Sequence, residues 1–206
     1  MMVGRLQARL LVALTPALLG VAPAGAARFT IAPGAGSEVR FDSKAPVESF
    51  SGRTDRVSGW VDCDPAALGD SVTIEVSVDL ASLDTGIALR NQHMRENHLE
   101  TDRYPRAVFR GGRLTGAPSR LVPGETATLE LAGELELHGV RRPLRLPVQV
   151  TLGDTDGGPR LRIEARFHVA LAAHEIRRPQ FLMLKLSDVQ QVTLKLVAGG
   201  SPGGGE

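Results

Sequence analysis

The stretch Val72-Thr73-Ile74-Glu75-Val76-Ser77-Val78-Asp79-Leu80 decides the fold. Every even-numbered position in it is apolar and every odd-numbered position is polar. Successive side chains of a β-strand point to opposite sides of the sheet, so this two-residue period matches a strand with one buried and one exposed face. The stretch therefore predicts a long, half-buried strand.

The same alternation returns several times along the chain. Further long strands are predicted over residues 129–137, 144–152, 161–169 and 192–196, and shorter strands over 39–43, 48–52, 57–61 and 107–111. Turn-forming Pro, Gly and Asp residues separate these segments. Eight or nine strands joined by short turns indicate an antiparallel sheet.

Residues 83–100 break this rhythm, because they lack alternation and contain several helix-forming residues. We predict a short helix or helical turns there, ended by Thr101-Asp102 before Tyr104-Pro105. One short helical segment cannot cover a long sheet, so the sheet must hide its apolar face either by folding over into two layers or by curling shut, and closure is the more economical of the two. Closure also leaves no strand edge free to pair with other chains. The sequence therefore predicts an all-β barrel.

Alternation alone does not say which face of the barrel wall is inside. An apolar outer wall would make an outer-membrane barrel, which carries aromatic girdles at both membrane interfaces. Aromatic residues make up only 4% of this chain. The same arrangement would also crowd charged residues into the lumen, namely Glu75, Asp79, Glu130, Glu134, Glu136 and Arg145. We therefore predict that the apolar side chains point inward.

The N-terminus has the layout of a secretory signal peptide. Arg5 and Arg9 precede an uncharged stretch from Leu10 to Val21, and Ala24-Gly25-Ala26 supplies the small residues of a cleavage site. The apolar run is shorter than the roughly 20 residues that span a bilayer. We expect residues 1–26 to be removed, a mature chain without a transmembrane segment, and a periplasmic or secreted location.

Composition limits the remaining classes. The chain has 24 Lys and Arg residues against 23 Asp and Glu residues, so nothing in its charge favours a nucleic-acid partner. We expect residues 27–197 to form one domain and the Gly-rich residues 198–206 to be a disordered tail. The single cysteine, Cys63, lies between Asp62 and Asp64, whose negative charges predict an unreactive thiol.

Histidines supply the main alternative chemistry. Two of the five, His93 and His98, lie five residues apart, which on an α-helix would point them roughly 140° away from one another. A haem or redox role for His93 with its neighbour Met94 stays open, although the chain has no Cys-x-x-Cys-His motif. His138 precedes Gly139 in a predicted turn, where we expect it to make a local hydrogen bond. No Gly-x-Ser-x-Gly motif is present, so we predict no catalytic residues.

Several segments, taken in order, resemble the YceI-like family of secreted lipid-binding barrels. They are Ser37–Phe41, Phe50–Gly52, Val57–Pro65, Ser82–Gly86, Arg90–Arg95, Tyr104–Phe109 and Gly133–Pro143. The resemblance implies an eight-stranded antiparallel, lipocalin-like barrel with a short helical insertion and an elongated apolar cavity. It also implies an isoprenoid, quinone-type or fatty lipid as the ligand, with no settled catalytic reaction. From the residues themselves we expect no metal site and no cofactor.

Residues on the inward face are the candidates for lining such a cavity. We select Phe41, Phe50, Val61, Val76, Val78, Phe109, Leu135, Leu137, Val148, Ile163, Phe167 and Leu194. A polar cluster in the helical segment is the candidate for binding the lipid head group, and it comprises Arg90, Asn91, His93 and Arg95. Alternatively, the two arginines only solvate this segment and pair with Glu96 or Glu100.

The favoured function is thus a periplasmic or secreted carrier that binds one long-chain apolar lipid and performs no chemistry. Two alternatives stay open. One is a redox or haem-associated accessory protein that uses His93 and Met94. The other is a stress-protective structural barrel whose interior is filled by side chains. Homodimer formation is left open.

Overall fold

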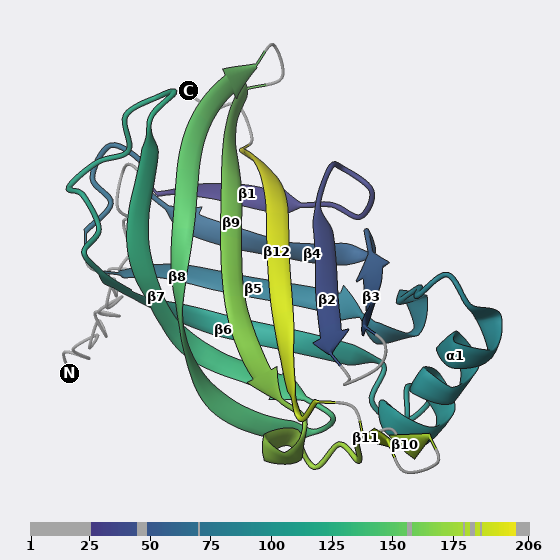
Figure 1. The fold of residues 1–206 in the computed structure, drawn as a ribbon. Coiled ribbons are helices and arrows are strands. Elements are labelled where there is room, and N and C mark those ends of the chain that lie inside the picture. The colour runs from purple at the N-terminus through teal and green to yellow at the C-terminus, as the bar shows by residue number, and fades with distance from the viewer. Residues whose placement is uncertain are drawn as a thin grey trace, which may run out of the picture.

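Eight antiparallel strands close into a barrel in the computed structural model, which describes residues 26–44, 49–69, 71–155, 158–178, 180–181, 184–185 and 187–200. In their order around the barrel they are β1 (Ala27–Ile31), β4 (Val57–Cys63), β5 (Ser71–Asp79), β6 (Arg106–Thr115), β7 (Thr126–Leu137), β8 (Val140–Thr155), β9 (Gly158–Ala170) and β12 (Val189–Gly200). β12 pairs back onto β1 and completes the ring (Figure 1). The predicted fold class is confirmed.

Closure depends on β12, which pairs with two strands along one of its edges. Residues 191–195 of β12 pair with β2 (Glu38–Lys44), and residues 198–200 pair with β1. At the junction the buried Ser37 hydroxyl accepts a hydrogen bond from the Val197 backbone N–H, at 3.0 Å. β3 (Ser49–Thr54) pairs with β2 and extends the wall beside this seam.

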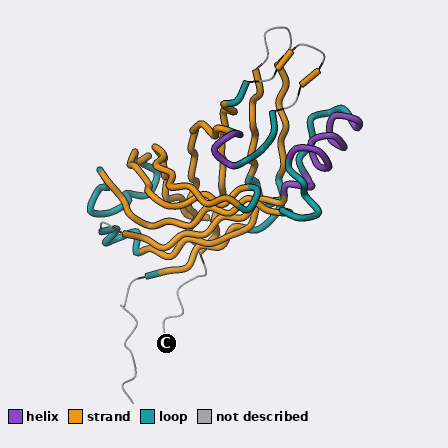
Figure 2. Tube along the Cα trace, turned by 90° about the horizontal axis from the view of Figure 1, so that it is seen from below, coloured by secondary structure: helices purple, strands orange, loops and turns teal. Residues whose placement is uncertain are grey.

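A helical insertion, residues 80–105, joins β5 to β6. It contains a 3₁₀ turn η1 (Leu80–Ser82), the helix α1 (Ala88–His93) and a π-helical turn η2 (Met94–His98), as the sequence predicted for this region. The loop after β9 carries a second 3₁₀ turn, η3 (Ala172–His174), and the hairpin β10 (Gln180–Phe181) with β11 (Leu184–Lys185). Figures 1 and 2 show α1, β10 and β11 at the same end of the barrel, which we call the mouth. Within the described residues, no helix is long and apolar enough to cross a membrane.

Two sequence-based expectations about the chain ends need correction. Strand β1 was not predicted, because residues 27–31 are too few to show a clear alternation. The predicted tail began at residue 198, but residues 198–200 continue β12 and pair with β1. Gly199 and Gly200 show no apolar alternation in the sequence, yet their backbones complete the pairing of β12 with β1. Residues 201–206 and the predicted signal peptide before Ala26 lie outside the described residues.

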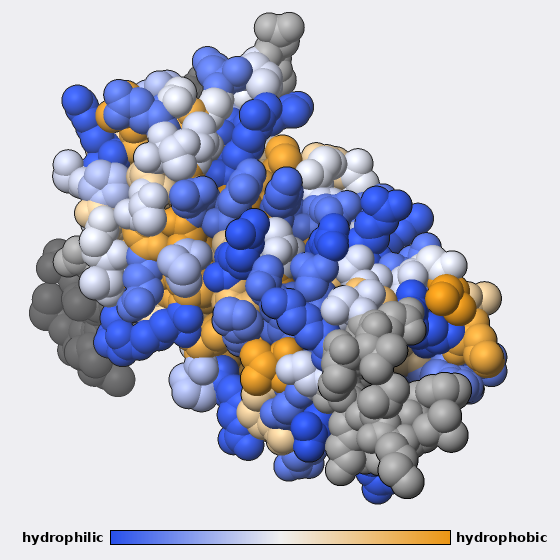
Figure 3. Space-filling view, viewed as in Figure 1, coloured by the Kyte–Doolittle hydropathy of each residue, from blue (hydrophilic) through white to orange (hydrophobic). Residues whose placement is uncertain are grey.

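The apolar side of the wall points inward. Along β5, Ile74, Val76 and Val78 are buried, whereas Thr73 and Asp79 are exposed. The outer surface over β7, β8, β9 and β12 is mostly hydrophilic (Figure 3).

Trp60 is at a position of β4 whose side chain points outward, and it is only partly buried. The Arg28 guanidinium lies 4.4 Å from the centre of the Trp60 ring. It also donates two hydrogen bonds to the Asp62 carboxylate.

The end of the barrel opposite the mouth, which we call the closed end, is packed with buried apolar side chains. Two loops cover it, tied by hydrogen bonds from the Leu68 N–H to the Ser119 carbonyl and from the Leu121 N–H to the Pro65 carbonyl. Burial raises the pKa of the nearby Cys63 thiol to about 11, with smaller contributions from Asp64 and Asp62. The predicted unreactive thiol thus owes its high pKa mainly to burial.

We predict that Phe29→Ala lowers the free energy of unfolding by about 3–5 kcal/mol, because the ring is fully buried at the closed end beside the seam. Phe50→Ala is the matched control: its ring is only half-buried, and the expected loss is about 1 kcal/mol. Urea unfolding followed by circular dichroism measures both. Equal losses would show that the closed end does not hold the barrel together.

Candidate binding cavity

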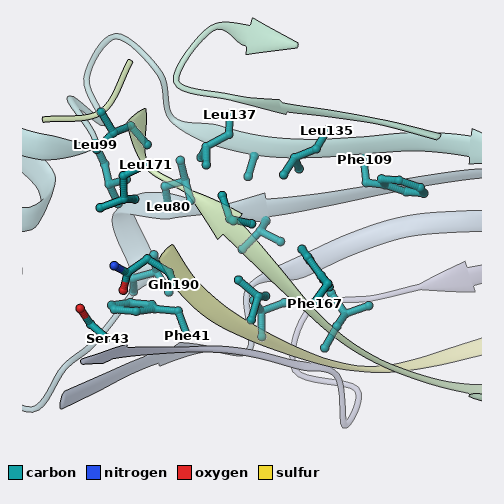
Figure 4. Close-up of a pocket in the computed structure, with 18 of the residues that line it drawn as sticks. Phe41, Ser43, Leu80, Leu99, Phe109, Leu135, Leu137, Phe167, Leu171 and Gln190 are labelled. Atoms are coloured by element: carbon teal, nitrogen blue, oxygen red, sulfur yellow. The ribbon is translucent and has the colours of Figure 1, made fainter. Parts of the chain in front are cut away.

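A cavity of about 760 Å³ occupies the mouth half of the barrel. Side chains from β2, β3, β5 to β9, β12 and the helical insertion line it, and nearly all of them are apolar (Figure 4). The exceptions are Ser43, Arg90, His93, His98 and Gln190. This volume is in the range of protein pockets that enclose small organic ligands. The interior of the barrel is therefore not filled by side chains. This contradicts the alternative of a structural barrel with a filled interior.

Glycines in the wall help to keep this space open. A Cβ atom at Gly133 would lie 2.5 Å from Cζ of Phe109, and one at Gly111 would lie 2.8 Å from the same atom. A Cβ atom at Gly52 would lie 2.3 Å from Cε1 of Phe41. Both phenylalanine rings thus pack directly against the backbone of these glycines. A side chain at any of the three positions would push the ring toward the centre of the barrel.

Eleven of the twelve residues predicted to line a cavity do line this one. They are Phe41, Phe50, Val76, Val78, Phe109, Leu135, Leu137, Val148, Ile163, Phe167 and Leu194. Val61 is the exception, since it does not line this cavity. It points inward as expected, but at the closed end, where it borders a separate pocket of about 50 Å³. Alternation reports the inward direction and carries no information about depth along the barrel axis.

Sequence reasoning missed lining residues of two kinds. Val39, Leu131, Leu146 and Val192 share the inward parity of their strands, so the same signal could have found them. Others come from segments without a regular period and gave no such signal, namely Ile87, Leu89, Met94, Leu99, Leu171 and Ile176.

Only two of the four residues predicted to bind the lipid head group lie at the cavity. Arg90 and His93 line the cavity. Asn91 instead braces the insertion: its Oδ1 accepts hydrogen bonds from the Thr85 N–H and hydroxyl, and its Nδ2 donates to Asp84 at 2.7 Å. Arg95 donates to the Ala81 carbonyl at 3.3 Å and is not among the lining residues. The structure therefore brings only Arg90 and His93 of the four residues to the cavity, because one helical turn points its residues in several directions.

Arg90 is held firmly at the rim. Its Nε donates to the Thr85 hydroxyl at 2.9 Å, and its Nη2 donates to the Thr85 carbonyl at 2.8 Å. Its guanidinium lies 4.3 Å from the centre of the Phe50 ring. Neither arginine of the cluster forms a described ion pair with Glu96 or Glu100, since Glu96 accepts from Gln92 and Glu100 contacts His138.

The insertion is anchored to the barrel at its start. Asp84 and Arg53 exchange two backbone hydrogen bonds of 3.0 Å, which tie the insertion to β3. The Gly86 N–H and the Asn91 side chain donate to the Asp84 carboxylate and hold its pKa below the usual value. The entrance to the cavity is thus built on a fixed base.

A second anchor lies at the end of the insertion. His138 has a positive φ of 53° in the turn between β7 and β8, followed by Gly139 at 73°. Its Nε2 lies 2.9 Å from Oε2 of Glu100, and its Nδ1 donates to the His174 carbonyl at 3.2 Å. His138 was expected to make a local hydrogen bond, but both of its bonds are to distant residues, and they join three separate segments at the mouth.

His93 and His98 both line the cavity, although their five-residue spacing on an α-helix would point them roughly 140° from one another. The reason is the π-helical turn, in which the Leu99 N–H bonds to the Met94 carbonyl five residues back and the rotation per residue is smaller. Burial lowers the pKa of His98, whose Nδ1 lies 3.0 Å from the Arg177 carbonyl. Across the described ranges, no three His, Cys, Asp or Glu residues come together as metal ligands.

Exposed apolar residues continue the cavity lining onto the surface. Ile87 and Leu89 line the cavity, yet they are 50% and 61% exposed. A hydrophobic patch is visible at the end of the molecule that carries α1 (Figure 3). The cavity therefore opens to the outside beside this helix.

Comparison with protein families gives one model, described as a YceI-like domain, that matches residues 29–198. This range covers the whole ring of strands almost to the end of β12. It includes all of the segments that resemble this family in sequence.

Named relatives agree with this match. A UPF0312 protein of Vibrio parahaemolyticus is 28% identical over 147 residues, which cover 69% of this chain and 74% of that protein. Protein YceI of Escherichia coli O157:H7 is 31% identical over 108 residues, which cover 50% of this chain and 52% of that protein.

Solved structures share the fold at low sequence identity. BcnA of Burkholderia cenocepacia has a TM-score of 0.64 at 21% identity, covering 79% of this chain and 96% of BcnA. A polyisoprenoid-binding domain from Saccharophagus degradans has a TM-score of 0.61 at 20% identity, covering 84% of this chain and 98% of that domain.

We predict that Gly52→Ala shrinks the cavity at the mouth, because the new methyl group would push the Phe41 ring inward. An apolar fluorescent dye should bind several-fold more weakly, with a stability loss of about 1–3 kcal/mol from overpacking. Gly199→Ala is the control, since nothing lies within 4 Å of its Cβ position. Unchanged dye binding by Gly52→Ala would show that Phe41 does not limit the space.

Proposed function

Because the chain belongs to the YceI-like family, we propose that it is a carrier that holds one long-chain lipid in its barrel and performs no chemistry on it. The observation that carries this proposal is the apolar cavity of about 760 Å³ that opens at the mouth of a closed barrel. The polyisoprenoid-binding domain of Saccharophagus degradans, which shares the fold, supports an isoprenoid or quinone-like chain as the ligand.

The energetics suit such a ligand. Burying a methylene group contributes about 0.8 kcal/mol without any directional contact, so a long tail can be held by an apolar wall alone. The closed end limits how deep the tail can go, because side chains fill that half of the barrel. The affinity should thus grow with chain length until the tail reaches this packed region.

The mouth supplies a route for the lipid to enter. The exposed Ile87 and Leu89 also line the cavity, so they offer an apolar path from the surface to its interior. Arg90 and His93 lie at the same opening, where we propose that they meet any polar part that extends beyond the cavity.

We further propose that the carrier works in the periplasm or outside the cell. The support is the predicted signal peptide over residues 1–26, with Arg5 and Arg9 before an apolar stretch. A lipid carrier is useful there because long-chain lipids are nearly insoluble in the aqueous space between or outside membranes.

Protein purified from its native host should carry a long-chain lipid at close to one molecule per chain, because the cavity gives an apolar tail a dry environment. Extraction with organic solvent followed by mass spectrometry measures this. A coloured preparation with a Soret band would instead support the haem alternative at His93 and Met94. An empty extract, together with no uptake of added prenyl lipids, would contradict the carrier.

A ligand series that differs only in the number of isoprene units should bind more tightly with length and then reach a plateau. Leu135→Trp should bring the plateau to shorter ligands, because Leu135 lines the cavity and the larger ring takes up its space. Glu134→Trp is the matched control, since Glu134 is exposed on the outer wall. Fluorescence titration measures affinity. If Leu135→Trp leaves unchanged the chain length at which the affinity stops rising, the lipid does not bind in this cavity.

A further inference from the structure

Two buried polar atoms in the cavity wall have no hydrogen-bond partner within the described part of the chain. They are the Ser43 hydroxyl oxygen and the Gln190 amide oxygen. Ser43 is 2% exposed and Gln190 is 7% exposed, and both residues line the cavity. Leaving a buried polar atom unpaired costs about 1–3 kcal/mol, so such atoms indicate a missing partner.

The two atoms belong to neighbouring strands. β12 and β2 pair Gln191 with Asp42, and one further step of this register places Gln190 beside Ser43 on the inward side. Figure 4 shows both side chains next to Phe41, at the end of the cavity where Leu80 and Leu99 mark the helical insertion. The polar pair therefore lies just inside the mouth.

The hydrogen-bonding capacity of the pair is defined. Nε2 of Gln190 donates to the Ser187 carbonyl at 2.6 Å, and a carbonyl can only accept, so this contact sets the orientation of the amide. Oε1 of Gln190 is then left to accept a hydrogen bond. The Ser43 hydroxyl can donate or accept. A partner that satisfies both must offer a donor to Gln190 and an acceptor or donor to Ser43.

We propose that Ser43 and Gln190 bind a neutral polar group of the lipid that both donates and accepts hydrogen bonds. A hydroxyl group, as in a prenol or a quinol, or a primary amide meets this requirement. The inference rests on the proposed carrier function and adds the chemistry of the head group. The lipid then lies with this group just inside the mouth and its tail toward the closed end.

Charged and purely accepting groups fit this position less well. An ionised carboxylate or phosphate has no proton for the Gln190 oxygen, and burying its charge next to apolar side chains is costly. The carbonyl of an oxidised quinone could accept from Ser43 but would leave Gln190 unpaired. The cationic side chain in the cavity wall, Arg90, is already bonded to Thr85 at the rim.

The test compares three ligands with the same tail: a linear prenol, its methyl ether and the matching hydrocarbon. Wild-type protein should bind the prenol about tenfold more tightly than the ether, which corresponds to one or two net hydrogen bonds. Ser43→Ala and Gln190→Met should each weaken prenol binding about three- to tenfold and leave hydrocarbon binding unchanged. Displacement of an apolar dye measures the affinities, and thermal unfolding checks the fold of each variant.

The controls are Gln191→Met and Ser77→Ala, because both residues lie on the outward parity of their strands and should change none of the affinities. If Ser43→Ala and Gln190→Met keep the full preference for the prenol, the inference is overturned and water satisfies these atoms. Tighter binding of a prenyl phosphate than of the prenol would also overturn it. If the hydrocarbon binds as well as the prenol, only this inference fails. If none of the three ligands binds, the carrier function itself fails.

Discussion

Ring closure through β12 is the constraint on which the rest of this structure depends. The strands bury one face each, and that face can be kept from water only if the sheet meets itself. β12 achieves this by pairing with β2 near the mouth and with β1 near the closed end. Because its 12 residues pass two successive partners, the wall stays continuous where the chain changes from one strand to the next.

The same wall encloses two different interiors. In the closed half, Phe29, Ile31 and Leu161 are less than 2% exposed, and the resulting burial stabilises the fold. In the mouth half, glycines let the rings of Phe41 and Phe109 lie against the wall, so space is left for a ligand. One half thus supplies the stability that the hollow half lacks.

Much of this could be predicted from the sequence, because alternation reports directly on which side a strand residue faces. It located Val76 and Val78 in the cavity wall, but it could not tell how deep Val61 lies. The π-helical turn that gathers His93 and His98 depends on packing at the mouth and has no local signature. Ser43 and Gln190 did leave a signal, since each is a polar residue on the inward parity of an apolar strand.

Pairing of Phe29 with Gly200 brings the two ends of the barrel domain together, and Figures 1 and 2 show α1 at the other end. An affinity tag or surface linker joined directly before Ala27 or directly after Gly200 would therefore be attached to the packed base. Immobilised molecules would all present their openings to the solution. This geometry makes the domain suitable for sensor surfaces on which ligand access must not depend on the coupling chemistry.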